Sequence, residues 1–105
     1  MSAEQIKIYP GESVYYELDV SEALPPGATS VSSATVTAHK VTSAGALGDT
    51  YSALLNSSTC VVVGNKIRFK IVLALAGERY RVEIATTTND SQIFKSRLFF
   101  NCAGA

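Results

Sequence analysis

The fold of this chain is decided by the stretch RYRVEIATTTNDSQIFKSRLFF, residues 79–100. At its start the apolar residues Tyr80, Val82 and Ile84 alternate with charged ones, and the residues from 94 to 100 repeat this alternation. A period of two is typical of a β-strand with one face buried and one face in water. The stretch therefore predicts two amphipathic strands joined by a polar turn.

The pairing of these two strands follows from the rule that directly opposed side chains share a face. A two-residue turn at Asn89-Asp90 would set Ile84 opposite Lys95 and mix the faces. We therefore predict a three-residue loop, 89–91, with a left-handed position that Asn or Asp tolerates. The predicted register pairs Thr86 with Phe94, Ile84 with Ser96, Val82 with Leu98, Tyr80 with Phe100 and Glu83 with Arg97.

The rest of the chain shows the same strand periodicity and no sustained helical period. Turn residues such as Pro10-Gly11 and Gly64-Asn65 separate the runs every 8–12 residues or so, as in β-sandwiches. We predict an all-β fold, an antiparallel Ig-like β-sandwich of about seven strands, forming one domain over residues 1–105. Residues 43–58 are the least defined and are expected to form a loop with a short edge strand. The strand-like runs are 5–9, 14–20, 34–39, 60–63, 67–75, 80–84 and 94–100, with a weaker candidate at 50–55.

The composition excludes several classes of protein. The 105 residues are 47% hydrophobic and have no net charge, whereas disorder requires low hydrophobicity and high net charge. The longest apolar run, Ile71–Ala76, is far shorter than the roughly 20 residues of a spanning helix. Glu4 and Gln5 stand where a secretory signal would have a basic start and an apolar stretch, so we expect neither a signal nor membrane binding.

The zero net charge hides a division along the chain. Residues 1–59 sum to −4 and residues 60–105 to +4. We expect Glu17 and Asp19 to face Arg68 or Lys70 across a strand pair, as exposed ion pairs of a few tenths of a kcal/mol each. The outward basic residues form a candidate interaction face: Arg68, Lys70, Arg79, Arg81, Lys95 and Arg97.

Two interpretations of this division remain open. Two solvated sheet faces could neutralise each other within the fold, or a polarised subunit could stack on copies of itself or on a protein partner. Nucleic acid is not expected as a partner, because the chain lacks both excess positive charge and exposed stacking aromatics.

Residues for catalysis are few. The single histidine, His39, falls on a predicted strand as an exposed residue, with no second histidine to form a metal cluster. Cys60 and Cys102 stand apart from any Cys-x-x-Cys motif, so we expect free thiols, at least one of them in the core, although a disulfide stays an alternative. No phosphate-binding glycine loop is present. The sequence predicts no enzyme activity, cofactor or metal.

Two segments resemble a known family. They are YYELDVS (residues 15–21) with LPPGATSVSSATVT (24–37), and LAGERYRVEI (75–84) with the final strand ending in Phe99-Phe100. Together they resemble the small Ig-like or fibronectin-III-like sandwich proteins of tailed-phage structural gene clusters, called fiber–tail adaptor or head–tail proteins. The resemblance covers about half of the chain. It departs from the family at Val36, where that family usually has Trp, and in residues 43–63.

The resemblance implies a structural subunit of a phage or prophage virion, near the tail, the head–tail connection or the fiber attachment. It implies protein partners, possible self-association, and location in the virion or, before assembly, in the cytoplasm of the bacterial host. It transfers no catalytic residue. The alternative is a stand-alone Ig-like binding or adhesion module that recognises a glycan or protein surface through its loops. For a glycan, Tyr9, Tyr51 and the 43–58 loop are the only candidate residues.

Overall fold

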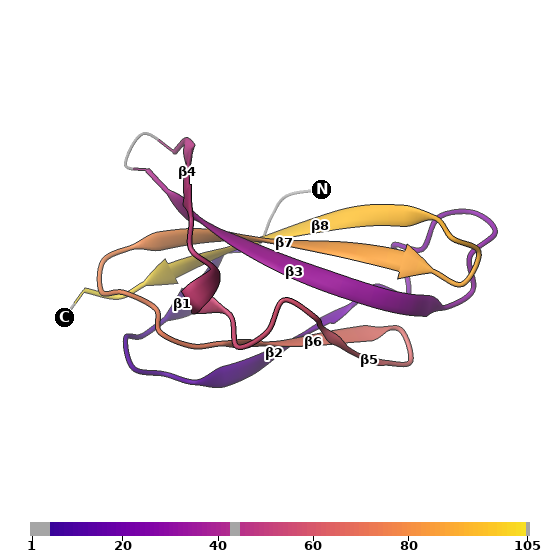
Figure 1. Ribbon diagram of the computed structural model, residues 1–105, viewed down its shortest axis with the longest axis horizontal. Coiled ribbons are helices and arrows are strands. Elements are labelled where there is room, and N and C mark those ends of the chain that lie inside the picture. Colours follow the sequence, from indigo (N-terminus) through magenta and orange to yellow (C-terminus); the bar gives the residue numbers. More distant parts are fainter. Residues whose placement is uncertain (1–4, 43–44, 105) are drawn as a thin grey trace.

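A computed structural model describes residues 5–42 and 45–104 of the chain (Figure 1). The described residues form eight strands and one turn of 3-10 helix, η1 (Ser52–Leu54). The strands are β1 (Gln5–Ile8), β2 (Val14–Asp19), β3 (Val31–Val41), β4 (Leu47–Thr50), β5 (Val61–Val63), β6 (Lys66–Ile71), β7 (Arg79–Thr88) and β8 (Ile93–Cys102).

The strands make two sheets that pack face to face, which confirms the predicted β-sandwich (Figure 1). The five-stranded sheet has the order β1-β8-β7-β3-β4, and the three-stranded sheet has the order β2-β6-β5. All neighbours are antiparallel except β1 and β8, which run parallel. The predicted all-antiparallel pairing is therefore wrong at β1. The chain crosses from the five-stranded sheet to the three-stranded sheet between β1 and β2.

The core lies between the sheets and is built from the inward residues of the alternating pattern. Tyr80, Val82 and Ile84 of β7 are fully buried, and Ile67 and Phe69 of β6 pack against them from the other sheet. Aromatic rings also connect the sheets, because the ring centroid of Phe100 lies 5.2 Å from that of Tyr16 and 6.3 Å from that of Phe69. Fully burying one side chain of this kind contributes roughly 1.5–3 kcal/mol, so these strands supply most of the hydrophobic stabilisation.

The hairpin of β7 and β8 has the predicted register. Thr86 faces Phe94, Ile84 faces Ser96, Val82 faces Leu98, Tyr80 faces Phe100 and Glu83 faces Arg97. The backbone N–H of Thr88 donates to the carbonyl of Gln92 at 2.8 Å, which leaves the predicted three-residue loop between them. The left-handed position is Ser91, with φ of 67°, rather than Asn89 or Asp90. It is the last residue of the loop, where a three-residue hairpin turn needs a positive φ.

The alternation over residues 67–75 predicts a longer strand than the structure contains. β6 ends at Ile71, and Leu73 adopts a φ of 43° and is 64% exposed, while Ala74 is buried in its place. Two tyrosines hold the connection to β7. The hydroxyl of Tyr51 donates to the carbonyl of Leu73, and the hydroxyl of Tyr80 accepts from the N–H of Leu75, each at 2.9 Å. The chain must cross here to the other sheet, so the prediction of one strand over residues 67–75 is wrong after Ile71, and Leu73 and Leu75 are exposed.

The weaker strand candidate at 50–55 is also wrong. β4 ends at Thr50 and the chain continues into η1, which buries Leu54. β4 is the short edge strand expected within 43–58, at the border of the five-stranded sheet. Residues 43 and 44 of that segment lie outside the described residues.

Candidate interaction surface

The six basic residues predicted as one interaction face lie on two different sheets. Arg68 and Lys70 belong to β6 of the three-stranded sheet, whereas Arg79, Arg81, Lys95 and Arg97 belong to β7 and β8 of the five-stranded sheet. Outward residues of the two sheets of a sandwich point in opposite directions. The predicted face therefore divides into two surfaces with different electrostatics.

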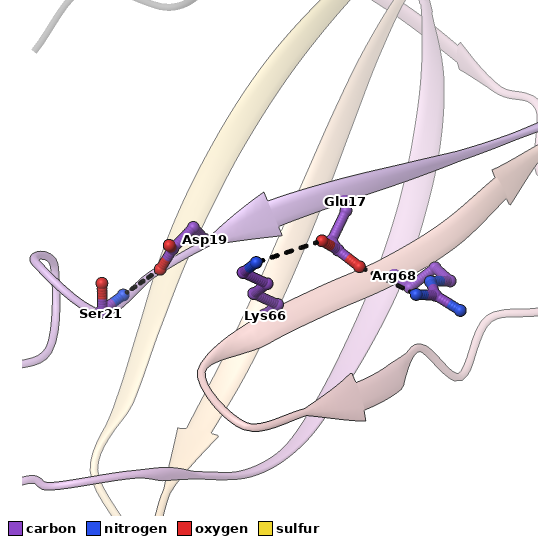
Figure 2. Close-up of polar contacts among 5 residues, drawn as sticks. All are labelled: Glu17, Asp19, Ser21, Lys66 and Arg68. Carbon is purple, nitrogen blue, oxygen red and sulfur yellow. Dashed lines mark hydrogen bonds and ion pairs between the residues drawn. The ribbon is translucent and has the colours of Figure 1, made fainter.

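The surface of the three-stranded sheet is close to neutral. Glu17 faces Arg68 across the β2–β6 pair, as expected, and its carboxylate lies 3.1 Å from the guanidinium of Arg68 and 3.9 Å from the ammonium of Lys66 (Figure 2). The expectation for Asp19 is wrong: it faces Lys66 rather than Arg68 or Lys70. Its carboxylate accepts a hydrogen bond of 2.9 Å from the N–H of Ser21. This hydrogen bond lowers the pKa of Asp19 below its usual value.

Lys70 is the exception on this surface. Its partner across the pair is Tyr15, and its ammonium lies 5.1 Å from the centroid of the Tyr15 ring. Among the described residues it has no carboxylate within 4.0 Å, the limit for an ion pair.

The surface of the five-stranded sheet is organised around one acid, Glu83. Its carboxylate lies 3.0 Å from the Nε of Arg97, 3.6 Å from the Nζ of Lys95 and 3.9 Å from the guanidinium of Arg81. The side chain of Glu83 is only 18% exposed. The hydrogen bond from Arg97, followed by the nearby charges of Lys95, Arg97 and Arg81, lowers the pKa of Glu83, so it stays ionised at neutral pH.

Two further cations extend this surface. Arg79 donates a hydrogen bond of 3.0 Å to the backbone carbonyl of Thr42. Lys7 comes from the acidic half of the chain, but the parallel pairing of β1 with β8 sets it beside Asn101, on the outward side. Lys7 could not be assigned to this surface from the sequence, because no local signal shows which strand β1 joins. We call Lys7, Arg79, Arg81, Lys95, Arg97 and Glu83 the basic face; five cations against one acid give it a net charge of +4.

The side chains considered for chemistry in the sequence are two cysteines and one histidine. Cys60 and Cys102 are free and buried, as predicted for thiols in the core, and burial raises the pKa of Cys60 to about 11. His39 is half-buried rather than exposed, facing Arg81 across the β3–β7 pair, and its Nδ1 has no hydrogen-bond partner. No group of three or more metal-ligating side chains gathers within the described part of the chain. A cavity of about 120 Å³ between β3 and residues 50–58 contains no titratable side chain.

At one end of the sandwich, hydrogen bonds join the β2–β3 and β7–β8 loops. In the β7–β8 loop, the side-chain oxygen of Asn89 accepts from the N–H groups of Thr29 and Ser30 in the β2–β3 loop, at 3.1 and 3.3 Å. The amide of Gln92 donates to the carbonyl of Pro26 at 2.9 Å. These bonds fix the two loops relative to each other.

No family model matches the chain, and no curated protein is significantly similar to it. In the ranges 5–42 and 45–104, no helix is long and apolar enough to cross a bilayer.

Proposed function

We propose that this chain is a non-enzymatic structural or interaction subunit that docks through its basic face onto an acidic protein surface. The observation behind this proposal is the cluster of five cations on the basic face, with Glu83 as the single acid among these six residues. Complementary charge across an interface speeds encounter and excludes partners of the wrong sign. The opposite surface neutralises its own charges through Glu17, Lys66 and Arg68, so it offers no such contrast.

A protein surface fits this face better than a nucleic acid does. Glu83 occupies the middle of the cations, where a phosphate backbone would meet a fixed negative charge. Proteins that bind single strands also present aromatic rings on which bases stack. Phe99 on the outward side of β8 is half-buried beside β1. The exposed ring of Tyr9 already carries the ammonium of Lys7 over one side, 5.5 Å from its centroid.

Two features support an Ig-like sandwich as the class of this fold. The order β8-β7-β3-β4 opposite β2-β6-β5 corresponds to strands G, F, C and C′ opposite B, E and D of immunoglobulin domains. Tyr80, near the start of the strand that corresponds to F, bonds through its hydroxyl to the backbone N–H of Leu75, five residues upstream. This is the arrangement of the tyrosine corner.

The most specific form of the proposal is a phage or prophage virion component at the tail, the head–tail connection or the fiber attachment. It rests on the resemblance of the Leu24–Gly27 loop and the Gly77–Val82 element to phage adaptor proteins, in the same order along the chain. Mass spectrometry of purified particles, induced from a host strain that encodes the chain, tests it. The chain is expected at a copy number comparable to that of tail or connector proteins; particles that lack it would refute the virion role.

The basic face is tested separately with model polyanions. We expect the chain to bind a poly-glutamate peptide, with an affinity that falls as salt is raised, and to bind a single-stranded oligonucleotide more weakly. Lys95→Glu is expected to weaken the binding severalfold. Lys66→Glu is the matched control on the other sheet. The Lys95 side chain is 60% exposed and its ammonium lies 3.6 Å from Glu83, and the Lys66 side chain is 54% exposed and its ammonium lies 3.9 Å from Glu17. Equal losses in both variants, or preference for the oligonucleotide, would argue against the proposal.

The joined loops favour a second candidate, an Ig-like binding or adhesion module. Asn89 and Gln92 hold the β2–β3 and β7–β8 loops in one arrangement, which lowers the entropy cost of binding through them. This candidate predicts that Asn89→Ala reduces ligand binding while Lys95→Glu leaves it unchanged. A glycan array with the intact chain is the direct test; of the tyrosines considered for a glycan, Tyr9 is exposed and Tyr51 is half-buried.

A further inference from the structure

The edge strand β2 has backbone groups without a strand partner. The N–H of Val20 donates to the carbonyl of Asn65 beside β6 at 2.9 Å, which shows that even-numbered residues here point their backbone groups at β6. In a strand these directions alternate, so the N–H and C=O groups of Tyr15, Glu17 and Asp19 point away from β6. Among the described residues no strand pairs with this side of β2.

β2 is also the least protected edge of the sandwich. The other edge strands are short: β5 has three residues, and β1 and β4 have four each. The pairing of β4 with β3 is also irregular. In contrast, β2 runs for six residues without proline. Short length, irregular pairing and proline are the devices with which edge strands avoid pairing with another chain. The charge of Glu17, which could also protect the edge, is partly neutralised by Arg68 at 3.1 Å.

We propose that the β2 edge pairs with the β2 edge of a second copy of this chain, antiparallel and about a two-fold axis, so that two three-stranded sheets become one. Only odd-numbered residues of β2 point their N–H and C=O groups away from β6, which restricts the possible registers of the dimer. In the register that we propose, Tyr15 faces Glu17 of the second copy and Glu17 faces its Tyr15. A shift by two residues in one direction would set Glu17 opposite Glu17, and like charges directly opposed are destabilising. A shift in the other direction would set Tyr15 opposite Tyr15 and would pair only residues 14–16 of β2.

The apolar side of β2 fits the same register. Tyr16 would face Tyr16 at the two-fold axis, and Leu18 would face Val14 of the second copy. Tyr16 and Leu18 are half-buried and Val14 is 37% exposed, so the pairing would cover apolar surface that the edge leaves in water. Aromatic and apolar pairs of this kind contribute to the stability of a sheet.

The outer side of β2 supplies charge complementarity. The ammonium of Lys70 lies over the Tyr15 ring at 5.1 Å and has no carboxylate within ion-pair distance in the described structure. In the proposed register Glu17 of the second copy stands beside Tyr15, on the side away from Lys70. The Tyr15 ring would therefore lie between the two side chains, about two strand spacings or roughly 10 Å apart at their backbones. Each Lys70 ammonium would gain an opposite charge across the interface.

The interface lies on the sheet opposite the basic face, so the dimer proposal and the docking proposal can be tested independently of each other. A strand-edge contact is small, and small interfaces form transient complexes. We expect sedimentation equilibrium of the intact chain to show a reversible monomer–dimer transition between about 10 µM and about 500 µM. A chain that stays monomeric over this range would overturn the proposal.

Hydrogen exchange, measured residue by residue, tests the edge itself. The amides of Tyr15 and Glu17 are expected to become protected at high concentration, whereas Tyr16 and Leu18, bonded to β6, are protected at every concentration. A dimer in which Tyr15 and Glu17 exchange as fast as in the monomer would place the contact elsewhere and overturn the assignment.

Variants test the register. Lys70→Glu sets acids against Glu17 and is expected to weaken dimerisation at least tenfold. Lys40→Glu is the matched control, because the ammonium of Lys40 lies at the same 5.1 Å over the ring of Tyr51, away from β2. Glu17→Pro removes an N–H that points away from β6 and leaves the hydrogen bonds to β6 in place, so it is expected to abolish the dimer. Glu17→Ala removes the same carboxylate but keeps the N–H, so it is expected to weaken the dimer less. Equal effects of Lys70→Glu and Lys40→Glu would refute the register.

Discussion

Removing one hydroxyl group, in Tyr80→Phe, tests how the chain is held where it crosses from β6 to β7. The Tyr80 side chain is fully buried, its hydroxyl accepts the N–H of Leu75 at 2.9 Å, and its ring stacks on that of Tyr51 with centroids 5.6 Å apart. Phenylalanine keeps the ring and its packing. The variant therefore isolates the hydrogen bond that fixes the connection.

The expected loss follows from what happens to the backbone N–H. An ordinary hydrogen bond contributes about 0.5–1.5 kcal/mol net, and a partly buried donor left unpaired costs about 1–3 kcal/mol. We expect Tyr80→Phe to lower the free energy of unfolding by about 1–2 kcal/mol. For a domain of this size that corresponds to a fall in Tm of roughly 4–8 °C per kcal/mol.

The assay is equilibrium urea unfolding followed by far-UV circular dichroism, with thermal unfolding as a second measure. The urea concentration at the unfolding midpoint should fall. The slope of the unfolding free energy against urea concentration should stay unchanged, because the fold and its buried area remain the same. Tyr51→Phe is the control: it loses a 2.9 Å hydrogen bond to the carbonyl of Leu73 in an exposed setting, where water can replace it, so we expect about 0.5 kcal/mol or less. The reasoning is refuted if Tyr80→Phe destabilises the protein no more than Tyr51→Phe does.

Three further predictions concern single side chains. Ser91→Gly should raise the free energy of unfolding by about 0.5–1 kcal/mol, because Ser91 holds a φ of 67° that glycine adopts without strain; no gain over Ser91→Ala in urea unfolding would contradict this. Cys60 should react with a thiol reagent at pH 8 roughly a hundredfold more slowly than a free cysteine, because its pKa of about 11 leaves little thiolate; rapid reaction of the native protein would show that the site is open. Glu83→Gln should destabilise the protein by about 1 kcal/mol at pH 7, because three cations lose their acid. Since the folded pKa of Glu83 is lowered, its stabilisation is present above about pH 4.3, the usual glutamate pKa, and is lost as pH falls through the folded value. Urea unfolding of both proteins from neutral to acidic pH should therefore show the difference shrinking, and a constant difference would argue against the ion pairs.

The local features of this fold could be predicted from the sequence. Alternation places Tyr80, Val82 and Ile84 inward, and the requirement that opposed residues share a face is strong enough to set the β7–β8 register and its loop length. These predictions succeed because a strand's side-chain period and a short hairpin depend on residues close in sequence.

The tertiary structure decided which surfaces exist. Alternation continues through Leu73 and Leu75, yet the chain has to leave β6 after Ile71 in order to reach the other sheet, and no local pattern marks that point. Lys7 belongs to the basic face because β1 pairs with β8. Arg68 and Lys70 were predicted to share a face with the other basic residues, but they lie on the other sheet because β6 pairs with β2. The sequence by itself determined which residues face outward, since that depends on the period of the strand. Which outward residues share a surface, and which edge stays free, depends on contacts between strands far apart in the chain, so only the folded sandwich decides them.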